Sequence, residues 1–282
     1  MEVIKGISRM REFVREQKAA GQRIGLIPTM GYLHEGHLSL VREAHKTCQT
    51  AVMSIFVNPL QFGVNEDLDA YPRDLTRDCE LAEKAGVAAI FAPPVSEMYP
   101  PGGVDSYVVV ENITEGLCGT SRPGHFRGVS TVVTKLFNIV QPDVAVFGQK
   151  DAQQAIVIQR MVRDLNMPLQ IAVAPIVREA DGLALSSRNV YLSPAEREAA
   201  LSLSRSLKMT SALVAGGERN AAVIKKAIEE QISREPLARI DYIELVRAED
   251  LKRVEILDGR ILIALAVFIG KTRLIDNQIV EG

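Results

Sequence analysis

The most constraining feature of this sequence is the regular alternation of apolar runs and helical patterns over its first 175 residues. The segment 50–57 is almost continuously apolar, which is typical of a strand buried on both faces of a sheet. The segment 7–19 instead spaces its apolar side chains as an amphipathic helix does. Strands that alternate with helices of this length form a parallel sheet covered on both faces, so we predict an α/β fold with a doubly wound parallel sheet. In chain order, the predicted helices and strands of this part are 7–19, 23–28, 38–48, 50–57, 75–85, 88–91, 129–140, 143–147, 152–165 and 169–173.

The pattern changes after residue 175. Two predicted helices, 194–214 and 221–233, are separated by a Gly-Gly pair, and two predicted strands, 240–246 and 260–268, follow without a helical crossover. Strands joined without crossovers pair antiparallel. We therefore predict a smaller α+β C-terminal domain over 176–282, built around an antiparallel hairpin or meander.

Composition argues against several classes of protein. Lys plus Arg number 33 and Asp plus Glu 35, for a net charge of −2, whereas a general nucleic-acid binder usually has a basic excess. The longest apolar run, 261–269, has nine residues, about half the length that spans a bilayer. The N-terminus lacks the apolar core of a signal peptide, and the three cysteines, Cys48, Cys79 and Cys118, form no Cys-x-x-Cys motif. We therefore expect a cytoplasmic enzyme with reduced thiols that binds neither membrane nor nucleic acid.

One segment carries most of the functional signal: PTMGYLHEGH at 28–37 follows the first predicted strand and opens the next helix. Ligands of doubly wound sheets bind at the carboxyl ends of the strands, and a helix N-terminus offers N–H groups and a positive dipole to an anion. Gly31 and Gly36 let the backbone approach a ligand closely. Because His34 and His37 are three residues apart, both can point at one phosphate and stabilise charge that develops there. The segment therefore predicts a nucleotide phosphate site.

Two other interpretations of His34 and His37 stay open. Both side chains could cap or pack the helix without contacting a ligand. They could also bind a metal, although no third and fourth His or Cys ligand stands at a convincing spacing. Other phosphate motifs are missing, since no Gly-x-Gly-x-x-Gly follows a strand and Leu265 stands where a P-loop would need Gly. The predicted phosphate grip is therefore the segment that contains the two histidines.

A second segment with phosphate-compatible groups is GQKD at 148–151, in another predicted strand-to-helix turn. Lys150 can supply a point charge to phosphates, and Asp151 suits a helix N-cap or a contact with a ribose. Alone, this segment could equally be an ordinary turn.

The third segment is LSSRN at 185–189, directly after the predicted parallel sheet. The hydroxyls of Ser186 and Ser187 beside the guanidinium of Arg188 form a compact set that could clamp a triphosphate. Alone, it could equally be a polar loop. Because all three segments are predicted at the ends of the same sheet, together they favour a nucleoside triphosphate as the ligand.

With these residues in place, the sequence resembles the pantoate–β-alanine ligase family, within the nucleotidyltransferases that share a His-x-Gly-His signature. The resemblance covers nearly the whole chain, and related adenylyltransferases share the first matching segment but not the set. Three positions depart from the family pattern: Tyr32 stands where Ala is frequent, Gln149 where Glu is common, and Ala152 where an aromatic residue is usual. The matching segments are PTMGYLHEGH at 28–37, FVNPLQF at 56–62, DAYPRD at 69–74, RPGHFRGV at 122–129, FGQKDAQQ at 147–154, LSSRN at 185–189 and GKTRLIDN at 270–277.

The resemblance implies a Rossmann-like nucleotide-binding and catalytic domain over 1–175, a C-terminal domain over 176–282 that acts as a lid, and a homodimer. It implies Mg²⁺ on the phosphates, with Asp78 as a protein contact. It also implies pantoate binding by Gln61 and Gln154, with Asn58 and Tyr71 in the same pocket, and β-alanine binding by Gln61 and Arg122, for which a structural ion pair is the alternative. The residues implied to contact ATP are Met30, Gly31, Tyr32, Leu33, His34, Glu35, Gly36, His37, Gly148, Gln149, Lys150, Asp151, Val177, Leu185, Ser186, Ser187 and Arg188.

The activity implied by the resemblance is the condensation of pantoate with β-alanine through a pantoyl adenylate, with release of AMP and pyrophosphate. His37 is then the proton donor, and His34, Lys150, Ser186, Ser187 and Arg188 complete the catalytic set. Rival functions are an adenylyltransferase that leaves AMP on a phosphorylated precursor and a non-catalytic ATP-binding regulator. A tRNA synthetase is a weaker third, because the chain has no appended basic region.

Overall fold

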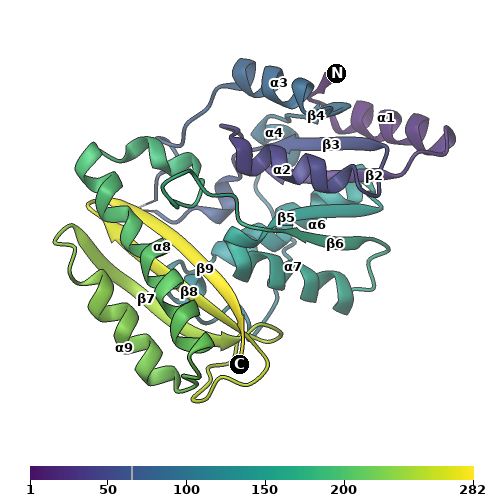
Figure 1. The fold of residues 1–282 in the computed structure, drawn as a ribbon. Helices are drawn as coiled ribbons and strands as arrows, with labels where there is room; N and C mark the ends of the chain where they lie inside the picture. Colours follow the sequence, from purple (N-terminus) through teal and green to yellow (C-terminus); the bar gives the residue numbers. More distant parts are fainter. Residues whose placement is uncertain (65) are drawn as a thin grey trace. The chain divides into compact units, whose positions relative to one another are not determined.

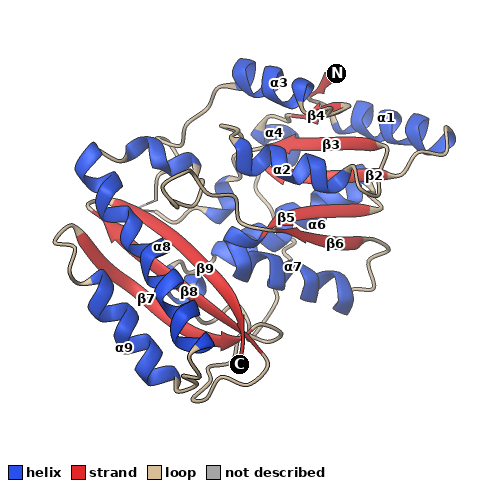
Figure 2. Ribbon diagram, viewed as in Figure 1, coloured by secondary structure: helices blue, strands red, loops and turns tan. Residues whose placement is uncertain are grey.

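The computed structural model describes residues 1–64 and 66–282 and contains a six-stranded parallel sheet (Figures 1 and 2). Its strand order is β1-β4-β3-β2-β5-β6, and every neighbouring pair is parallel. The predicted α/β fold with a parallel sheet is therefore confirmed. The strands are β1 (Glu2–Ile4), β2 (Ile24–Thr29), β3 (Thr50–Ile55), β4 (Ala89–Phe91), β5 (Val144–Gly148) and β6 (Gln170–Ala174).

Helices cover both faces of this sheet, as Figure 2 shows. On one face, Ile27 of β2 and Met53 of β3 pack with Val41 of α2 and Ala82 of α3 in one apolar cluster. Helices α1 and α6 contact each other and β2 but contribute nothing to that cluster, so they cover the opposite face, because successive strand residues point to opposite sides. The long helices of this part are α1 (Ile7–Ala19), α2 (Glu35–Ala44), α3 (Leu75–Lys84), α6 (His125–Val140) and α7 (Ala152–Asp164).

The strand order places a topological switch point at β2. From β2 the chain builds outward through β3 and β4, and it later returns to form β5 on the other side of β2. In open α/β sheets, ligands bind outside the carboxyl ends of the strands at such a point. The segment that leaves β2 is 30–37 and the segment that leaves β5 is 149–151, so two of the predicted phosphate segments follow the two strands that flank the switch.

A second, three-stranded sheet of order β7-β8-β9 is antiparallel throughout. The sequence of β8 is almost entirely apolar because the two faces of this strand pack in two different apolar clusters. Ile263 and Leu265 pack in the cluster beneath α8 and α9, whereas Leu262 and Ala264 pack on the other face with Ala152. The elements are α8 (Pro194–Ala215), α9 (Ala221–Ile232), β7 (Ala238–Arg247), β8 (Arg260–Ile269) and β9 (Thr272–Glu281), and the shorter pieces of the whole chain are η1 (Pro59–Gln61), α4 (Val95–Met98), α5 (Cys118–Ser121), η2 (Gln149–Asp151) and η3 (Ser187–Tyr191).

The structure differs from the predicted elements in several places, among them two strands and the starts of α2 and α6, the latter at His125 rather than at residue 129. Strands β1 and β9 were not predicted: β1 has only three residues, and β9 carries Asp276 and Asn277 in its middle, both buried, which hides its pattern. Helix α2 begins at Glu35 rather than at residue 38, because the His34 side chain caps it. The early start of α2 places His37 inside the first helical turn.

The chain folds into two compact units. The first comprises 1–111, 122–148 and 157–175, and the second comprises 112–121, 149–156 and 176–282. From the sequence we propose a single domain boundary at residue 175. This boundary would assign 112–121 and 149–156, which belong to the second unit, to the N-terminal domain.

No helix within 1–64 and 66–282 is both long and apolar enough to cross a membrane. Helix α8 has 22 residues, but charged side chains such as Arg205 and Lys208 interrupt it.

A glycine on α6 allows a close approach that a larger residue would prevent. A Cβ built on Gly128 would lie 2.6 Å from the Gln61 backbone nitrogen and closer still to the carbonyl oxygen of Leu60. We predict that Gly128→Ala pushes α6 away from η1 and lowers the free energy of unfolding by about 1 to 3 kcal/mol, as overpacking does.

Urea denaturation measures the loss. Gly63→Ala is the matched control, because it lies two residues after η1, is exposed, and would place its Cβ no closer than 3.6 Å to any neighbour; it should change stability by less than about 0.5 kcal/mol. Equal stabilities of the two variants would contradict the close contact.

Candidate functional site

The loop between β2 and α2 has a tight backbone that its sequence explains. Gly31 adopts a φ of +85°, and a Cβ there would lie 2.9 Å from Cγ2 of Ile55 and 3.0 Å from Oδ2 of Asp78. Tyr32 also has a positive φ, of 53°, a conformation that a non-glycine residue adopts only when its surroundings enforce it. Glycine is therefore required at position 31, and something must hold the backbone at position 32.

The group that holds this backbone is the carboxylate of Asp78, on α3. The Tyr32 N–H donates to Oδ2 and the Leu33 N–H donates to Oδ1, both at 2.7 Å. Asp78 is only 1% exposed; its burial raises the pKa of the carboxyl, against the opposing effect of the two backbone donors. This geometry gives Asp78 a structural role in the loop. The Mg²⁺ contact predicted for it stays a prediction, with both of its oxygens already accepting hydrogen bonds.

His34 and His37 form the N-terminal cap of α2. The Gly36 N–H donates to Nδ1 of His34 at 3.1 Å, and the His34 N–H donates to Nδ1 of His37 at 3.3 Å. The two rings lie 4.0 Å apart between centroids. Because both Nδ1 atoms accept hydrogen bonds, each neutral ring carries its proton on Nε2. Both side chains therefore cap the helix through Nδ1. The phosphate interpretation stays a prediction, and it would use the other nitrogen of each ring.

The metal interpretation of the two histidines finds no additional ligands. Over residues 1–64 and 66–282, no group of three or more His, Cys, Asp or Glu side chains is arranged to hold a metal ion. Structural and catalytic zinc sites use at least three such ligands.

Gln61, the predicted contact for pantoate, is held by a buried network in the first unit. The Asn58 amide donates to Oε1 of Gln61 at 3.0 Å and to the Gly128 carbonyl at 3.1 Å. The Tyr99 hydroxyl donates to Oδ1 of Asn58 at 2.7 Å, and burial raises the pKa of Tyr99, so it stays protonated. The Gln61 amide lies 3.3 Å from Sδ of Met30. The structure therefore brings Gln61 beside the loop that precedes the histidines.

Arg122, the predicted contact for β-alanine, makes an ion pair in this structure. Its guanidinium donates to both carboxylate oxygens of Glu66, at 2.8 and 2.6 Å. Burial alone would raise the pKa of Glu66, but the hydrogen bonds and charge of Arg122 outweigh it and hold that pKa below its usual value. Arg122 also donates to Nε2 of His125 at 3.0 Å, and Nδ1 of His125 then donates to the Gln61 carbonyl at 2.9 Å. The structure thus shows the ion pair, and the β-alanine contact stays a prediction.

The predicted phosphate groups of the second unit lie on two short helical turns. The Lys150 side chain, on η2, is 22% exposed, and its Nζ lies 4.0 Å from Asp151. Ser186 caps η3, with its hydroxyl accepting from the Arg188 N–H at 3.3 Å, and Ser187 is buried.

Val177 and Leu185, the two residues predicted to contact the adenine, are joined by a backbone hydrogen bond. The Leu185 N–H donates to the Val177 carbonyl at 3.0 Å. Gln154 is half-buried on α7.

The sequence-predicted residues divide between the two units. The first unit brings together the loop 30–37, Asp78, Gln61 and Arg122, and β5 ends there at Gly148. The second unit holds Gln149, Lys150, Asp151, Gln154, Val177, Leu185, Ser186, Ser187 and Arg188.

Sequence reasoning missed two positioning groups of the first unit. Asn58 was expected only to line the pocket, whereas it holds the Gln61 amide. Tyr99 was not singled out at all, and its hydrogen bond to Asn58 joins positions 41 residues apart. The motif FVNPLQF contains Asn58 and could have drawn attention to it; no pattern marks Tyr99.

The loop geometry predicts a large effect of one substitution. Asp78→Ala would leave two backbone N–H groups without their acceptor, and each such loss costs about 1 to 3 kcal/mol. We therefore expect the free energy of unfolding to fall by about 3 kcal/mol or more, as measured by urea denaturation.

Asp74→Ala is the matched control. Asp74 caps the same helix through a single exposed hydrogen bond to the Arg77 N–H at 3.0 Å, so its loss should cost about 1 kcal/mol. If the two variants lost the same stability, the carboxylate of Asp78 would not be what holds the loop.

Comparison with known proteins identifies the family to which the chain is similar. A family model described as pantoate-beta-alanine ligase matches residues 2–279. The pantothenate synthetase of Heliobacterium modesticaldum is 61% identical over 281 residues, which cover 100% of both chains. That of Moorella thermoacetica is 60% identical over 281 residues, covering 100% of this chain and 99% of its own.

Solved structures give the same result. The fold matches pantothenate synthetase from Thermus thermophilus with a TM-score of 0.94 and 44% identity over 100% of both chains. It also matches pantoate-beta-alanine ligase from Francisella tularensis, a structure in complex with beta-gamma ATP and beta-alanine, with a TM-score of 0.79 and 33% identity over 99% of this chain and 97% of that one. The model match over almost the whole sequence, together with relatives at this level of identity, establishes that the chain belongs to the pantoate–β-alanine ligase family.

Proposed function

We propose that this protein joins pantoate to β-alanine to form pantothenate, using ATP and releasing AMP and pyrophosphate. The observation that carries the proposal is the pair of histidines at the N-terminus of α2, whose Nδ1 atoms accept backbone N–H groups. A neutral ring bonded in this way has its proton on Nε2. Family membership supports pantothenate formation, and the Francisella relative was solved with beta-gamma ATP and beta-alanine.

The chemistry explains why ATP is needed. A carboxylate does not react with an amine at a useful rate, because oxide would have to leave. When the pantoate carboxylate attacks the α-phosphorus of ATP, pyrophosphate leaves and pantoyl adenylate forms. The β-alanine amine then attacks the acyl carbon, and AMP leaves as the amide forms. Both steps place charge on phosphate oxygens, which is where preorganised donors stabilise a transition state most.

His37 and His34 supply such donors in this proposal. A neutral ring with its proton on Nε2 can donate a hydrogen bond or, as a general acid, the proton itself. The N-terminus of α2 adds backbone N–H groups and a positive dipole. We assign proton donation to His37, and we place His34 on the phosphates next to it.

The second unit contributes the remaining groups for phosphate. We propose that Lys150, Ser186, Ser187 and Arg188 contact the same triphosphate, with Val177 and Leu185 against the adenine. Mg²⁺ would neutralise phosphate charge when bound. An ion of this kind is commonly held by substrate phosphates and one or two carboxylates, which fits a chain whose described residues contain no cluster of acidic ligands.

The acids are proposed to bind through amide and guanidinium groups. Gln61 and Gln154 each offer a donor and an acceptor, which suits the hydroxyl and carboxylate groups of pantoate. Arg122 would receive the β-alanine carboxylate, and to do so its guanidinium would have to share or release Glu66.

Separating the two half-reactions tests the proposal. None of the three cysteines lies in a matched motif, so we place no covalent carrier and expect the acyl group to travel as a bound adenylate. Protein, Mg²⁺, ATP and pantoate without β-alanine should therefore exchange labelled pyrophosphate into ATP, and omission of pantoate should stop the exchange.

Mass spectrometry of the complete mixture should then show pantothenate and free AMP. A dinucleotide product would instead identify an adenylyltransferase, and ATP binding without turnover would identify a regulator. Exchange that required β-alanine would contradict the stepwise scheme.

The role of His37 predicts a defect in catalysis in a protein that still folds, with a loss of about 1 kcal/mol of stability for the missing cap bond to the His34 N–H. His37→Ala should lower kcat by about 100-fold or more, the scale for one lost acid or donor. His45→Ala is the matched control, because His45 follows the last residue of the same ten-residue helix, about 12 Å along its axis from His37. Its two ring nitrogens contact the backbone carbonyls of Cys48 and Gly86. Near-equal kcat values for the two folded variants would contradict the assignment.

A further inference from the structure

Asp276 and Asn277 end the segment GKTRLIDN at 270–277, which is part of the family resemblance. They lie in the middle of β9, with Asp276 3% and Asn277 4% exposed. Buried polar side chains in a strand destabilise the fold unless they are hydrogen-bonded. The groups to which they are bonded therefore indicate what they do.

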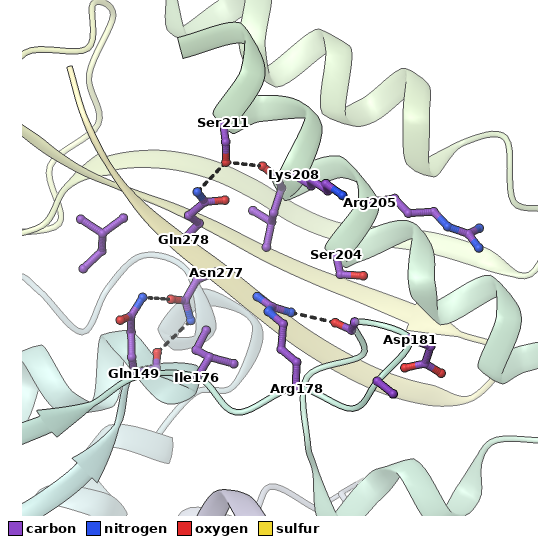
Figure 3. A pocket seen from close by; sticks show the side chains of 14 residues that line it. Gln149, Ile176, Arg178, Asp181, Ser204, Arg205, Lys208, Ser211, Asn277 and Gln278 are labelled. Carbon is purple, nitrogen blue, oxygen red and sulfur yellow. Dashed lines mark hydrogen bonds between the residues drawn. The ribbon is translucent and has the colours of Figure 1, made fainter. Parts of the chain in front are cut away.

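Asn277 holds the backbone of the Lys150 turn. Its Nδ2 donates to the carbonyl oxygens of Gln149 and Lys150, both at 2.9 Å. The Gln149 amide donates back to Oδ1 of Asn277 at 3.3 Å (Figure 3). Two donors of one planar amide fix the orientation of two consecutive carbonyls, and therefore of the backbone from which the Lys150 side chain projects.

Asp276 holds the segment that leads to Ser186. Its carboxylate accepts two hydrogen bonds from Arg178, at 2.6 and 2.9 Å, and Arg178 also donates to the Gly182 carbonyl at 3.1 Å. Arg178 pairs with Ala184 across a short antiparallel bridge, next to the backbone bond between Val177 and Leu185. The carboxylate thus fixes the base of a hairpin from which the chain enters Ser186.

One dipeptide can reach both segments because of strand geometry. Neighbouring residues of a strand point to opposite faces, so Asp276 and Asn277 extend to different sides of β9. The strand itself is fixed by pairing with β8, where Leu265 faces Asp276 and Ala264 faces Asn277. The bonds of this dipeptide therefore set the Lys150 turn and the hairpin relative to each other within the second unit.

On the side of the cavity, no packed side chains could hold the Lys150 turn in place of these hydrogen bonds. Gln149, Arg178 and Asn277 border a cavity of about 720 Å³ in the second unit, which Figure 3 shows from close by. Since a cavity supplies no packing contacts to the side chains that border it, hydrogen bonds hold the turn there.

We infer that Asp276 and Asn277 are positioning residues for ATP use, holding the Lys150 turn and the hairpin before Ser186 in the geometry that grips the triphosphate. This inference rests on the proposed function of Lys150, Ser186 and Arg188. It assigns Asp276 and Asn277 no contact with the substrate.

The test compares neighbouring amides on the same strand. Asn277→Ala removes the bonds to the Lys150 turn. Gln278→Ala, the control, removes a single bond of similar kind, in which the Gln278 amide donates to the Ser211 hydroxyl on α8 at 2.6 Å. We expect Asn277→Ala to lower kcat/KM for ATP by about 10- to 100-fold, the scale for a small misplacement of a binding group. KM for pantoate should change little, and Gln278→Ala should stay within about twofold of the unchanged protein by the same reasoning.

Asp276 provides a graded second variant in case Asn277→Ala does not fold. Asp276→Asn keeps the shape and one acceptor for Arg178, whereas Asp276→Ala keeps neither, so the loss of kcat/KM for ATP should be larger in the alanine variant. Circular dichroism and thermal unfolding establish which variants are folded. Unchanged ATP kinetics in folded Asn277→Ala or Asp276→Ala would overturn the inference. The inference would also be overturned if kcat/KM fell equally for ATP, pantoate and β-alanine and Gln278→Ala showed the same loss.

Binding separates this inference from the proposed function. If the unchanged protein made no pantothenate, the proposed function would fail. Calorimetric titration with a non-hydrolysable ATP analogue would still measure whether Asn277→Ala weakens nucleotide binding by at least about tenfold relative to Gln278→Ala. Equal affinities would overturn the positioning role.

Discussion

The loop that connects β2 to α2 in the first unit depends on one buried carboxylate. Asp78 accepts the N–H groups of Tyr32 and Leu33, which keeps the backbone at position 32 in a conformation that tyrosine rarely adopts. That conformation lets the chain turn from the end of β2 directly into α2. The N-terminus of the helix, its dipole and both histidines are oriented by this turn.

In each unit, a buried asparagine side chain bonds to backbone carbonyls. Asn58 bonds to the Gly128 carbonyl as well as to Gln61, and Asn277 bonds to two consecutive carbonyls. A hydrogen bond to a backbone carbonyl can form whatever side chain that residue carries. Such bonds therefore fix the path of a loop and leave the side chain of the predicted site residue available for a ligand. They also place that side chain more accurately than the packing of an exposed loop could.

The sequence predicted what depends on local pattern and missed what depends on partners far along the chain. The apolar runs located most strands of the parallel sheet, and the glycines and histidines of 28–37 located the loop at the switch point. Strand β9 was missed because Asp276 and Asn277 break its apolar pattern, and only their bonds to Arg178 and the Lys150 turn explain why polar residues stand there. The role of Asp78 was invisible for the same reason, since its partners lie 45 and 46 residues away.

The two interpretations of the histidine pair could not be separated by sequence, because they are not alternatives. Capping uses Nδ1 of each ring, and donation to a phosphate would use Nε2. The cap also determines the tautomer of each neutral ring. Because Nδ1 accepts a backbone N–H, the ring proton is on Nε2. A histidine that caps this helix is thereby prepared to act as a donor, whereas an ionised aspartate in its place would accept the backbone N–H groups and have no proton to donate.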